Sequence, residues 1–381
     1  MESKKVGIVT YFKNYNYGSV LQCYSMQQLI KKFGFNPIAL EQSEKGISWC
    51  VRKYIRLLIL GMSCLRYPQR GKNIYKSMNE SRRSCTTLPL NTREKYDIFL
   101  TKYIISETIS FNTLSKSSQD YYCFISGSDQ VWSTSGYFLN PYMFLQFASK
   151  EKRFSYAASF GSDDCPPWYK NKIKKYLNGY VRLSVRENSG LKIIKSLNLD
   201  AKIHVDPALL LTVNEWNNIA KMPKDQDYIF LYFLNSPSET AIKHIKMLVE
   251  QYPNLKIVCA PYYFDKLDKS FFNIVHAELS PEEFLGTINN ATIICTDSFH
   301  GVVFSIIYKK VFYVYMRDYT HGVSQNNRII TLLEHYLLQS QYVNDFNNFC
   351  IPDYKKTDLM IAEDQHRSFA YLRDILGGQN D

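Results

Sequence analysis

The chain has 381 residues, of which 45% are hydrophobic and 21% are charged, a composition typical of globular proteins that excludes wholesale disorder. This length exceeds what one ordinary core supports and favours two domains. Lys and Arg outnumber Asp and Glu by 46 to 35, and the net charge of +11 favours anionic partners. We do not expect nucleic acid among them, because the sequence has no RNP-like or zinc-finger signature.

The cysteines and the apolar runs indicate the compartment. None of the nine cysteines forms a CxxC pair, and several lie in apolar runs, which favours reduced, buried thiols. The start MESKKVGIVTYF lacks the features of a signal peptide. No apolar run approaches the roughly 20 residues that a membrane-spanning helix needs. We therefore expect a cytoplasmic protein.

The first elements predict a parallel α/β domain. Residues 6–12 form a short apolar run typical of a strand, residues 20–34 have apolar residues at helical spacing, and residues 36–40 predict a second strand. This βαβ order implies a parallel sheet. The later runs YYCFISGSDQVW, RFSYAASFG and YVRLSVREN each combine a strand with a polar turn. Ligands bind at such strand ends in open α/β sheets, so these turns are candidate site segments.

Residues 48–72 differ from the rest of this half. About a dozen mostly apolar residues are flanked by basic ones, namely Arg52, Lys53, Arg56, Arg66, Arg70 and Lys72. The stretch is too short to span a bilayer, but it could lie in the plane of an anionic membrane surface. A buried helix with solvated flanking charges explains the pattern equally well, so both interpretations stay open.

The pattern of alternating strands and helices restarts after residue 207. Four strand–helix pairs follow, which predicts a second Rossmann-like unit. We therefore expect an α/β protein with two Rossmann-like domains, at 1–207 and 208–354, facing a central cleft. A final helix within 355–381 could return to either domain, and we favour the N-terminal one. The cleft is the expected site.

The turn TDSFHG, residues 296–301, carries the most chemistry. Ser298 is a plausible N-cap of a helix whose free N–H groups would face an anion, and Gly301 would allow a ligand or backbone to come close. A helix cap explains these two residues but not His300, whose imidazole is suited to proton transfer at neutral pH. Asp297 could orient that ring or bind a substrate hydroxyl. A cap and a catalytic turn both remain possible on these residues alone.

Two turns in the first half offer polar ligand contacts. Ser128, Asp129 and Gln130 lie beside Trp132 and suit sugar hydroxyls and sugar faces, although a helix cap next to a core Trp is an equal alternative. The turn NYGSVLQ has one Gly, so it fails as a dinucleotide fingerprint. It could bring backbone and a hydroxyl to a polar ligand, or its Gly could serve turn geometry alone.

Two arginines could hold an anion. Arg186 ends an apolar strand beside Glu187, and its planar guanidinium suits either that carboxylate or an anionic ligand. Arg328, near the start of a predicted helix, is the best second contact. We find no P-loop, metal-ligand cluster or DxD-type motif. We therefore expect acid–base chemistry with fixed positive charge and without a metal or redox cofactor.

Five segments together resemble one family. In chain order they are NYGSVLQCYSMQQLI, FISGSDQVW, SYAASFG, LSVREN and TDSFHGVVFSIIYKKVF. This ordered set is similar to the polysaccharide pyruvyl transferase family over about residues 6–333. The resemblance implies a GT-B-like fold and the transfer of pyruvate from phosphoenolpyruvate onto two hydroxyls of a sugar, which gives a cyclic ketal. It also implies a role in capsule or exopolysaccharide synthesis.

The resemblance also assigns roles to residues. His300 becomes the principal acid–base group and Asp297 orients it, while Arg186 and Arg328 hold the charge of the donor. Together with the turns above, it predicts substrate contacts at Gly18, Ser19, Gln22, Ser128, Asp129, Gln130, Ser159, Ser298, Gly301 and Arg328. Asp129 and Gln130 are expected to hold the sugar.

The acceptor and the cellular location follow as further expectations. Such polymers are assembled on polyprenyl diphosphate carriers, so a lipid-linked acceptor and peripheral contact of residues 51–72 with the inner membrane face are expected. A GT-B glycosyltransferase that uses a nucleotide sugar is the nearest alternative. A non-catalytic carbohydrate-binding or membrane-surface protein is another, but such a module needs no cluster like His300, Asp297 and Arg186.

Overall fold

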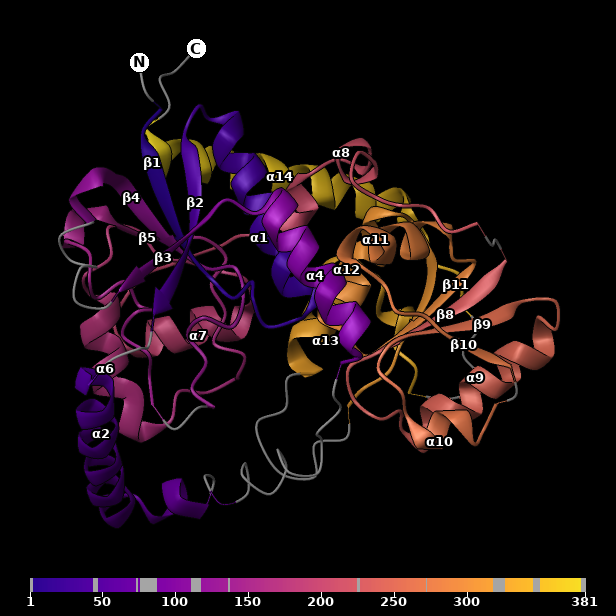
Figure 1. Ribbon diagram of the computed structural model, residues 1–381, viewed down its shortest axis with the longest axis horizontal. Coiled ribbons are helices and arrows are strands. Elements are labelled where there is room, and N and C mark those ends of the chain that lie inside the picture. The colour runs from indigo at the N-terminus through magenta and orange to yellow at the C-terminus, as the bar shows by residue number, and fades with distance from the viewer. Residues whose placement is uncertain are drawn as a thin grey trace.

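The computed structural model places two α/β domains side by side (Figure 1). It describes residues 3–43, 47–72, 75, 88–110, 118–135, 138–224, 227–271, 273–317, 326–344 and 350–377. No helix among these residues is long and apolar enough to cross a membrane.

The N-terminal domain is built on a parallel five-stranded sheet of order β3-β2-β1-β4-β5. Its strands are β1 (Lys5–Val9), β2 (Asn36–Ser43), β3 (Ser106–Ser110), β4 (Tyr121–Ser126) and β5 (Arg153–Ser155). A short parallel pair extends it, with β6 (Ser184–Val185) and β7 (Lys202–Ile203). The helices are α1 (Tyr17–Lys32), α2 (Ile47–Arg66), α4 (Leu90–Tyr103), α6 (Pro167–Leu177) and α7 (Asn188–Ser196).

The C-terminal domain repeats this plan with the sheet order β10-β9-β8-β11-β12. Its strands are β8 (Tyr228–Phe233), β9 (Lys256–Pro261), β10 (Ile274–His276), β11 (Ile293–Thr296) and β12 (Val311–Val314). Every residue of β8 and β11 is buried, as expected for a parallel sheet covered on both faces. The helices are α8 (Val213–Asn217), α9 (Glu239–Gln251), α10 (Asp265–Asp268), α11 (Pro281–Asn290), α12 (Phe299–Ile307) and α13 (Asn326–His335).

Apolar packing joins the two domains. α1 contacts α11 and α12 of the other domain. The ring of Tyr17 stacks on Phe284, with centroids 4.2 Å apart, and on Tyr96 at 4.9 Å. Because α1 is enclosed between its own sheet and the second domain, nearly all of its residues are buried. This interface fixes the distance between the two sets of strand ends that face the cleft.

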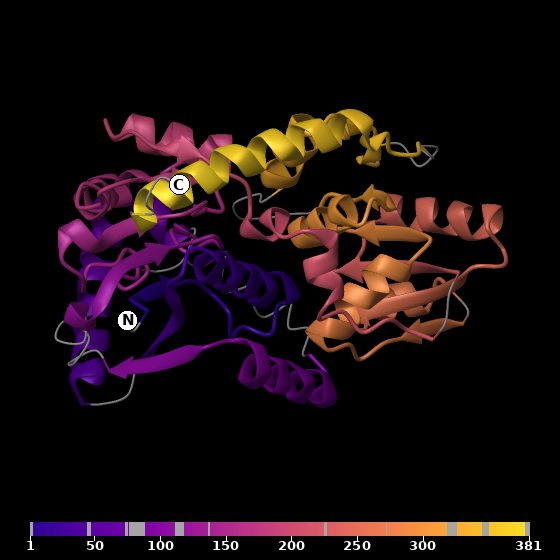
Figure 2. The same cartoon turned by 90° about the horizontal axis from the view of Figure 1, so that it is seen from above.

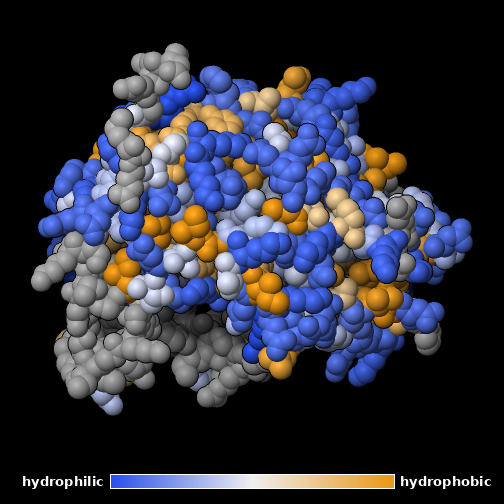
Figure 3. All heavy atoms as spheres, turned by 45° about the horizontal axis from the view of Figure 1, so that its top comes forward, coloured by the Kyte–Doolittle hydropathy of each residue, from blue (hydrophilic) through white to orange (hydrophobic). Residues whose placement is uncertain are grey.

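The last helix, α14 (Tyr354–Leu376), spans both domains, as Figure 2 shows. Near its start, the Tyr354 hydroxyl donates to the Lys310 carbonyl at 2.6 Å. Near its end, the Tyr371 hydroxyl donates to the Ser155 carbonyl at 2.8 Å. The helix therefore closes one side of the space between the domains. The face of the molecule in Figure 3 is mainly hydrophilic, with apolar residues in small separate groups.

Candidate functional site

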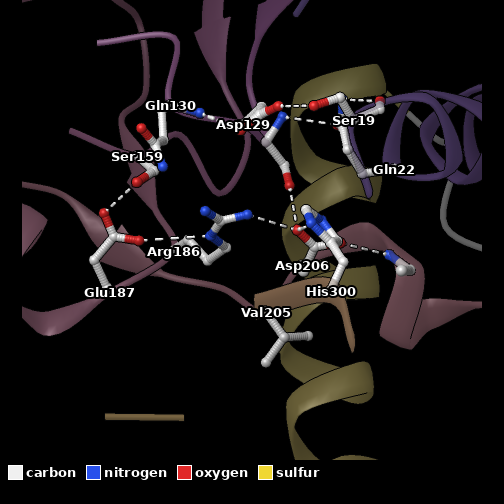
Figure 4. A network of polar contacts seen from close by, with 12 residues as sticks. Ser19, Gln22, Asp129, Gln130, Ser159, Arg186, Glu187, Val205, Asp206 and His300 are labelled. Carbon is white, nitrogen blue, oxygen red and sulfur yellow. Dashed lines mark hydrogen bonds and ion pairs between the residues drawn. The ribbon is translucent and has the colours of Figure 1, made fainter. Parts of the chain in front are cut away.

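Asp206 lies at the centre of a buried polar network in the cleft (Figure 4). It follows β7 and caps the short 3-10 helix η3 (Pro207–Leu210), and its Oδ1 accepts from the Ala208 amide at 3.0 Å. Its Oδ2 accepts from Ser128 Oγ at 2.9 Å and from Arg186 Nη1 at 2.8 Å. The same oxygen lies 3.4 Å from His300 Nε2. One carboxylate thus joins groups from both domains.

Charge, and not neutral hydrogen bonding alone, holds this network together. Burial raises the pKa of Asp206, but His300, Arg186 and the Ala208 amide lower it by more, and the pKa falls well below its usual range. Burial lowers the pKa of Arg186, but the carboxylates of Asp206 and Glu187 raise it by more. Both groups are therefore ionised at neutral pH.

Two arginines approach the ring of Phe299, the first residue of α12. The guanidinium carbon of Arg186 lies 4.2 Å from the ring centroid, and that of Arg328, in the first turn of α13, lies 5.8 Å away. Arg186 Nε is 3.5 Å from Glu187 Oε2, while its buried Nη2 has no hydrogen-bond partner within the described part of the chain. Burial and the charge of Arg186 lower the pKa of Arg328 to about 10. This pair is a ready site for an anion.

His300 lies in the first turn of α12, behind the N-cap Ser298, whose Oγ accepts from the Gly301 amide at 3.4 Å. Its imidazole lies against Gly18 of α1, in the other domain: a Cβ on Gly18 would be 1.9 Å from Nδ1. Gly18 therefore provides the space for the ring, and the other ring nitrogen is left beside Asp206. His300 Nε2 is buried and makes no hydrogen bond to any described residue.

The structure changes the expected role of Asp297. Its carboxylate accepts from the backbone amides of Leu234 at 2.7 Å and Asn235 at 3.0 Å, and from Arg317 Nε at 3.1 Å. Burial raises its pKa, although Arg317 and the two amides oppose this. The prediction that Asp297 orients His300 is therefore wrong in the described contacts. Asp297 ties together strand ends, and Asp206 is the carboxylate beside the imidazole.

Of the two close approaches expected at Gly301, by a ligand or by the protein itself, the contacts favour the second. A Cβ at this position would lie 2.4 Å from Thr296 Oγ1 and 2.9 Å from the Tyr232 ring. The close approach is therefore made by the protein's own sheet and not by a ligand. Gly301 lets α12 pack tightly on β8 and β11, which sets the depth at which His300 enters the cleft.

Ser19 and Asp129 bind each other across the N-terminal domain. Ser19 Oγ donates to Asp129 Oδ2 at 2.5 Å, and Asp129 Oδ1 accepts from the Gln130 amide at 2.7 Å. The side chain of Gln130 packs against Gly161, whose φ is +64°. These contacts join the first turn of α1 to the turn after β4.

Gln22 and Ser159 form hydrogen bonds to the residues that contact Asp206 and Arg186. The buried amide of Gln22 donates to Thr10 Oγ1 at 2.9 Å and accepts from the Ser128 amide at 3.3 Å. Ser159 Oγ donates to Glu187 Oε1 at 2.6 Å. Gln22 thus positions the serine that binds Asp206, and Ser159 positions the carboxylate beside Arg186.

The network opens on a cavity of about 790 Å³ between the strand ends, α13 and α14. Its walls include Arg186, Asp206, Phe299 and Arg328 on one side, and on another side His335, Asp364, Arg367 and Tyr371. Asp129 and Gln130 are not among the described residues that line it. The volume suits a ligand the size of a sugar unit.

Among the residues that the structure describes, no group of three or more His, Cys, Asp or Glu side chains is placed to hold a metal ion.

Sequence reasoning named His300, Arg186 and Arg328, and the structure brings them together around Phe299. It missed Asp206. The available signal was an Asp-Pro pair directly after the strand-like run AKIHV, at the predicted boundary between the domains.

Two Rossmann-like domains facing a charged cleft define the class of the protein as GT-B in fold. The structure is similar to S. aureus MnaA solved with UDP, with a TM-score of 0.52 and 12% identity over 99% of this chain and 98% of that one. It is also similar to a UDP-N-acetylglucosamine 2-epimerase, with a TM-score of 0.50 and 12% identity over 100% of this chain and 97% of the other. At this identity the likeness concerns the fold alone, and it confirms the predicted architecture.

The family to which the protein belongs is identified by its sequence. The sequence model of the family described as "Polysaccharide pyruvyl transferase" matches residues 16–319, which is most of the chain. The protein therefore belongs to the polysaccharide pyruvyl transferase family, and the predicted resemblance is confirmed. A comparison with curated proteins gave no match.

Proposed function

We propose that the protein transfers the pyruvyl group of phosphoenolpyruvate onto two hydroxyls of a sugar and forms a cyclic ketal in capsule or exopolysaccharide synthesis. The observation that carries this proposal is the buried Arg186 guanidinium, whose Nη2 is without a hydrogen bond among the described residues, next to the Asp206–His300 pair. A buried charged donor of this kind is costly unless a ligand completes it.

The donor fits the cationic side of the site. Phosphoenolpyruvate is compact and carries both a carboxylate and a phosphate, and the planar fork of Arg can bind either group at two points. Arg186 and Arg328 reach the same ring of Phe299 from different domains. In our proposal they hold the donor between them, with its enol carbon toward His300.

The reaction needs one proton donor and two deprotonated hydroxyls. His300 Nε2 delivers a proton to the methylene carbon, which becomes the methyl group, and the adjacent carbon takes on cationic character. One sugar hydroxyl adds to that carbon, the bond to the phosphate oxygen breaks, and the second hydroxyl adds in its place. Of the two hydroxyl protons, one restores His300 and the other leaves with phosphate. Asp206 stabilises the imidazole in its protonated form, before it delivers the proton and after a hydroxyl proton restores it.

The acceptor would enter through the cavity beside α14. His335 and Asp364 present polar groups along its wall, with His335 Nε2 2.6 Å from Asp364 Oδ2. His300 itself does not line the cavity, and in our proposal a sugar ring in this space brings two of its hydroxyls to the end formed by Arg186 and Asp206, next to His300. Asp129 and Gln130 were expected to hold the sugar. They instead contact Ser19 and Gly161 within the N-terminal domain.

The decisive experiment measures binding of phosphoenolpyruvate by calorimetry, with phosphate, pyruvate and UDP-N-acetylglucosamine as comparison ligands. We expect phosphoenolpyruvate to bind most tightly and Arg186→Gln to weaken its binding by about 100-fold. Arg182→Gln is the matched control, because Arg182 is half-exposed and pairs with Asp374 at 2.8 Å. Tight binding of the UDP-sugar without binding of phosphoenolpyruvate would replace the proposal with a glycosyltransferase.

Turnover is tested separately, with phosphoenolpyruvate and a lipid-linked oligosaccharide extract. We expect release of inorganic phosphate together with a carboxyethylidene mass increment on the glycan.

A further inference from the structure

We propose that α2 is the element by which this protein rests on an anionic lipid bilayer. Large apolar side chains along one stripe of the helix face solvent: Tyr54, Leu57, Leu58, Met62 and Leu65. Leu58 is 70% exposed and Leu65 is 84% exposed. Their spacing of three and four residues places them on the same face of the helix. Single exposed apolar residues need no explanation, but a continuous stripe marks a contact surface.

Contacts with α6 hold α2 in an orientation in which this apolar stripe faces solvent. Figure 1 shows α2 beside α6, away from both sheets. Just after its end, the ring of Tyr67 lies 6.1 Å from that of Trp168, and the buried Arg70 donates from Nη2 to the Tyr169 hydroxyl at 3.2 Å. The chain is thus fixed to α6 at this point. The interpretation of 48–72 as a buried helix does not fit the exposed residues from Tyr54 onward.

The charge of the segment identifies the partner. Residues 45–79 contain eight Lys or Arg and no Asp or Glu, while the rest of the chain has 38 basic and 35 acidic residues, a net charge of only +3. Most of the protein's net positive charge, +8 of +11, therefore falls in the segment that contains the apolar stripe. The side chains of Arg52, Lys53 and Arg56 lie outside the described residues, but Arg66 and Lys72 are described and exposed.

An anionic bilayer satisfies both features at once. Apolar side chains enter the boundary between headgroups and acyl chains, and basic residues attract the anionic headgroups around them. A second copy of the chain would oppose this cluster with an identical positive one, so self-association through α2 is disfavoured. No helix in the described part of the chain, α2 included, is long and apolar enough to cross a membrane.

Vesicle flotation tests the proposal. The full-length protein is mixed with vesicles of phosphatidylcholine and phosphatidylglycerol, or with phosphatidylcholine alone. We expect flotation with the anionic vesicles, reduced by salt, and little with the neutral ones. Leu58→Asp combined with Leu65→Asp should lower the partition coefficient by about tenfold or more. The change removes apolar area that would enter the bilayer and adds carboxylates that the anionic headgroups repel. Arg66→Gln combined with Lys72→Gln should lower it less and weaken its salt dependence.

The control is Leu359→Asp, which introduces one aspartate at a similarly exposed leucine of α14 and is compared with each single α2 change, Leu58→Asp and Leu65→Asp, as well as with the double variant. It should float like the unchanged protein, and circular dichroism should show that all variants are folded. Equal flotation of the α2 double variant and the control would overturn the proposal. So would a concentration-dependent dimer that the double variant abolishes, in the absence of any vesicle binding. Neither result bears on phosphoenolpyruvate binding, which is measured without lipid.

Discussion

The imidazole of His300 occupies the space that a side chain on Gly18 would fill. A Cβ at Gly18 would lie 1.9 Å from His300 Nδ1 and 2.2 Å from its Cγ. The two residues belong to different domains, Gly18 to the first turn of α1 and His300 to the first turn of α12. The ring that we propose as the proton donor is therefore positioned by the packing of one domain on the other.

Replacing Gly18 with Ala tests this relationship. The new methyl group must push the ring away from Asp206, and a displacement of about 1 Å in a catalytic group can cost roughly 100-fold in rate. We expect kcat to fall by about that factor while binding of phosphoenolpyruvate, measured by calorimetry, changes little. Gly61→Ala is the control, because a Cβ at Gly61 meets nothing within 4 Å. Normal kcat in Gly18→Ala would show that the ring need not stay where it is.

His300→Gln and Asp206→Asn test whether the pair acts as a unit. Each single change should lower kcat by roughly 100- to 10,000-fold, the range expected for loss of a general acid. If Asp206 works through His300, the double variant should be about as slow as the slower single variant. Phosphate release under saturating phosphoenolpyruvate and acceptor measures this. Effects that multiply in the double variant would mean that the two residues serve separate steps.

Local patterns were enough to predict the folds of both domains and the turns that carry the site. A strand followed by a polar turn is a signal within a few residues, and it identified the segments of Arg186 and His300. The centre of the site is not local: Asp206 binds Ser128, 78 positions away, and Arg186, 20 positions away. Asp297 is near His300 in sequence, but in this strand-to-helix turn its carboxylate binds amides after β8. The carboxylate closest to His300 in the sequence, that of Asp297, is therefore not the one beside its imidazole in the structure.

His335 provides a test of the acceptor cavity. Its side chain is 40% exposed and pairs with Asp364 on the wall formed by α13 and α14. His335→Gln keeps a hydrogen-bonding group but changes its shape and reach. We expect the KM for the sugar acceptor to rise by about 3- to 10-fold, equivalent to roughly 1 kcal/mol, with unchanged affinity for phosphoenolpyruvate. A change confined to the donor would mean that the acceptor does not use this wall.

His204 makes the stability of the fold dependent on pH. The ring is buried, with Nδ1 2.8 Å from Ser184 Oγ, and it packs on Tyr371 with centroids 4.3 Å apart. Burial, together with the charges of Lys202 and Arg367, lowers its pKa to about 4, although Asp364 opposes them. An unfolded chain would have a His pKa of about 6.5, so below that pH the unfolded state binds more protons and folding loses stability.

The expected loss can be measured by urea unfolding. Between about pH 7.5 and about pH 5 the neutral His204 should cost the folded protein about 2 kcal/mol of unfolding free energy. His204→Gln cannot titrate, so its stability, although lower at neutral pH through loss of the ring contacts, should fall less over the same interval. The difference between the two slopes isolates His204 from the carboxylates, which titrate in both proteins. Parallel slopes would mean that His204 is protonated in the folded state, or that the buried ring gains a compensating carboxylate partner such as Asp364.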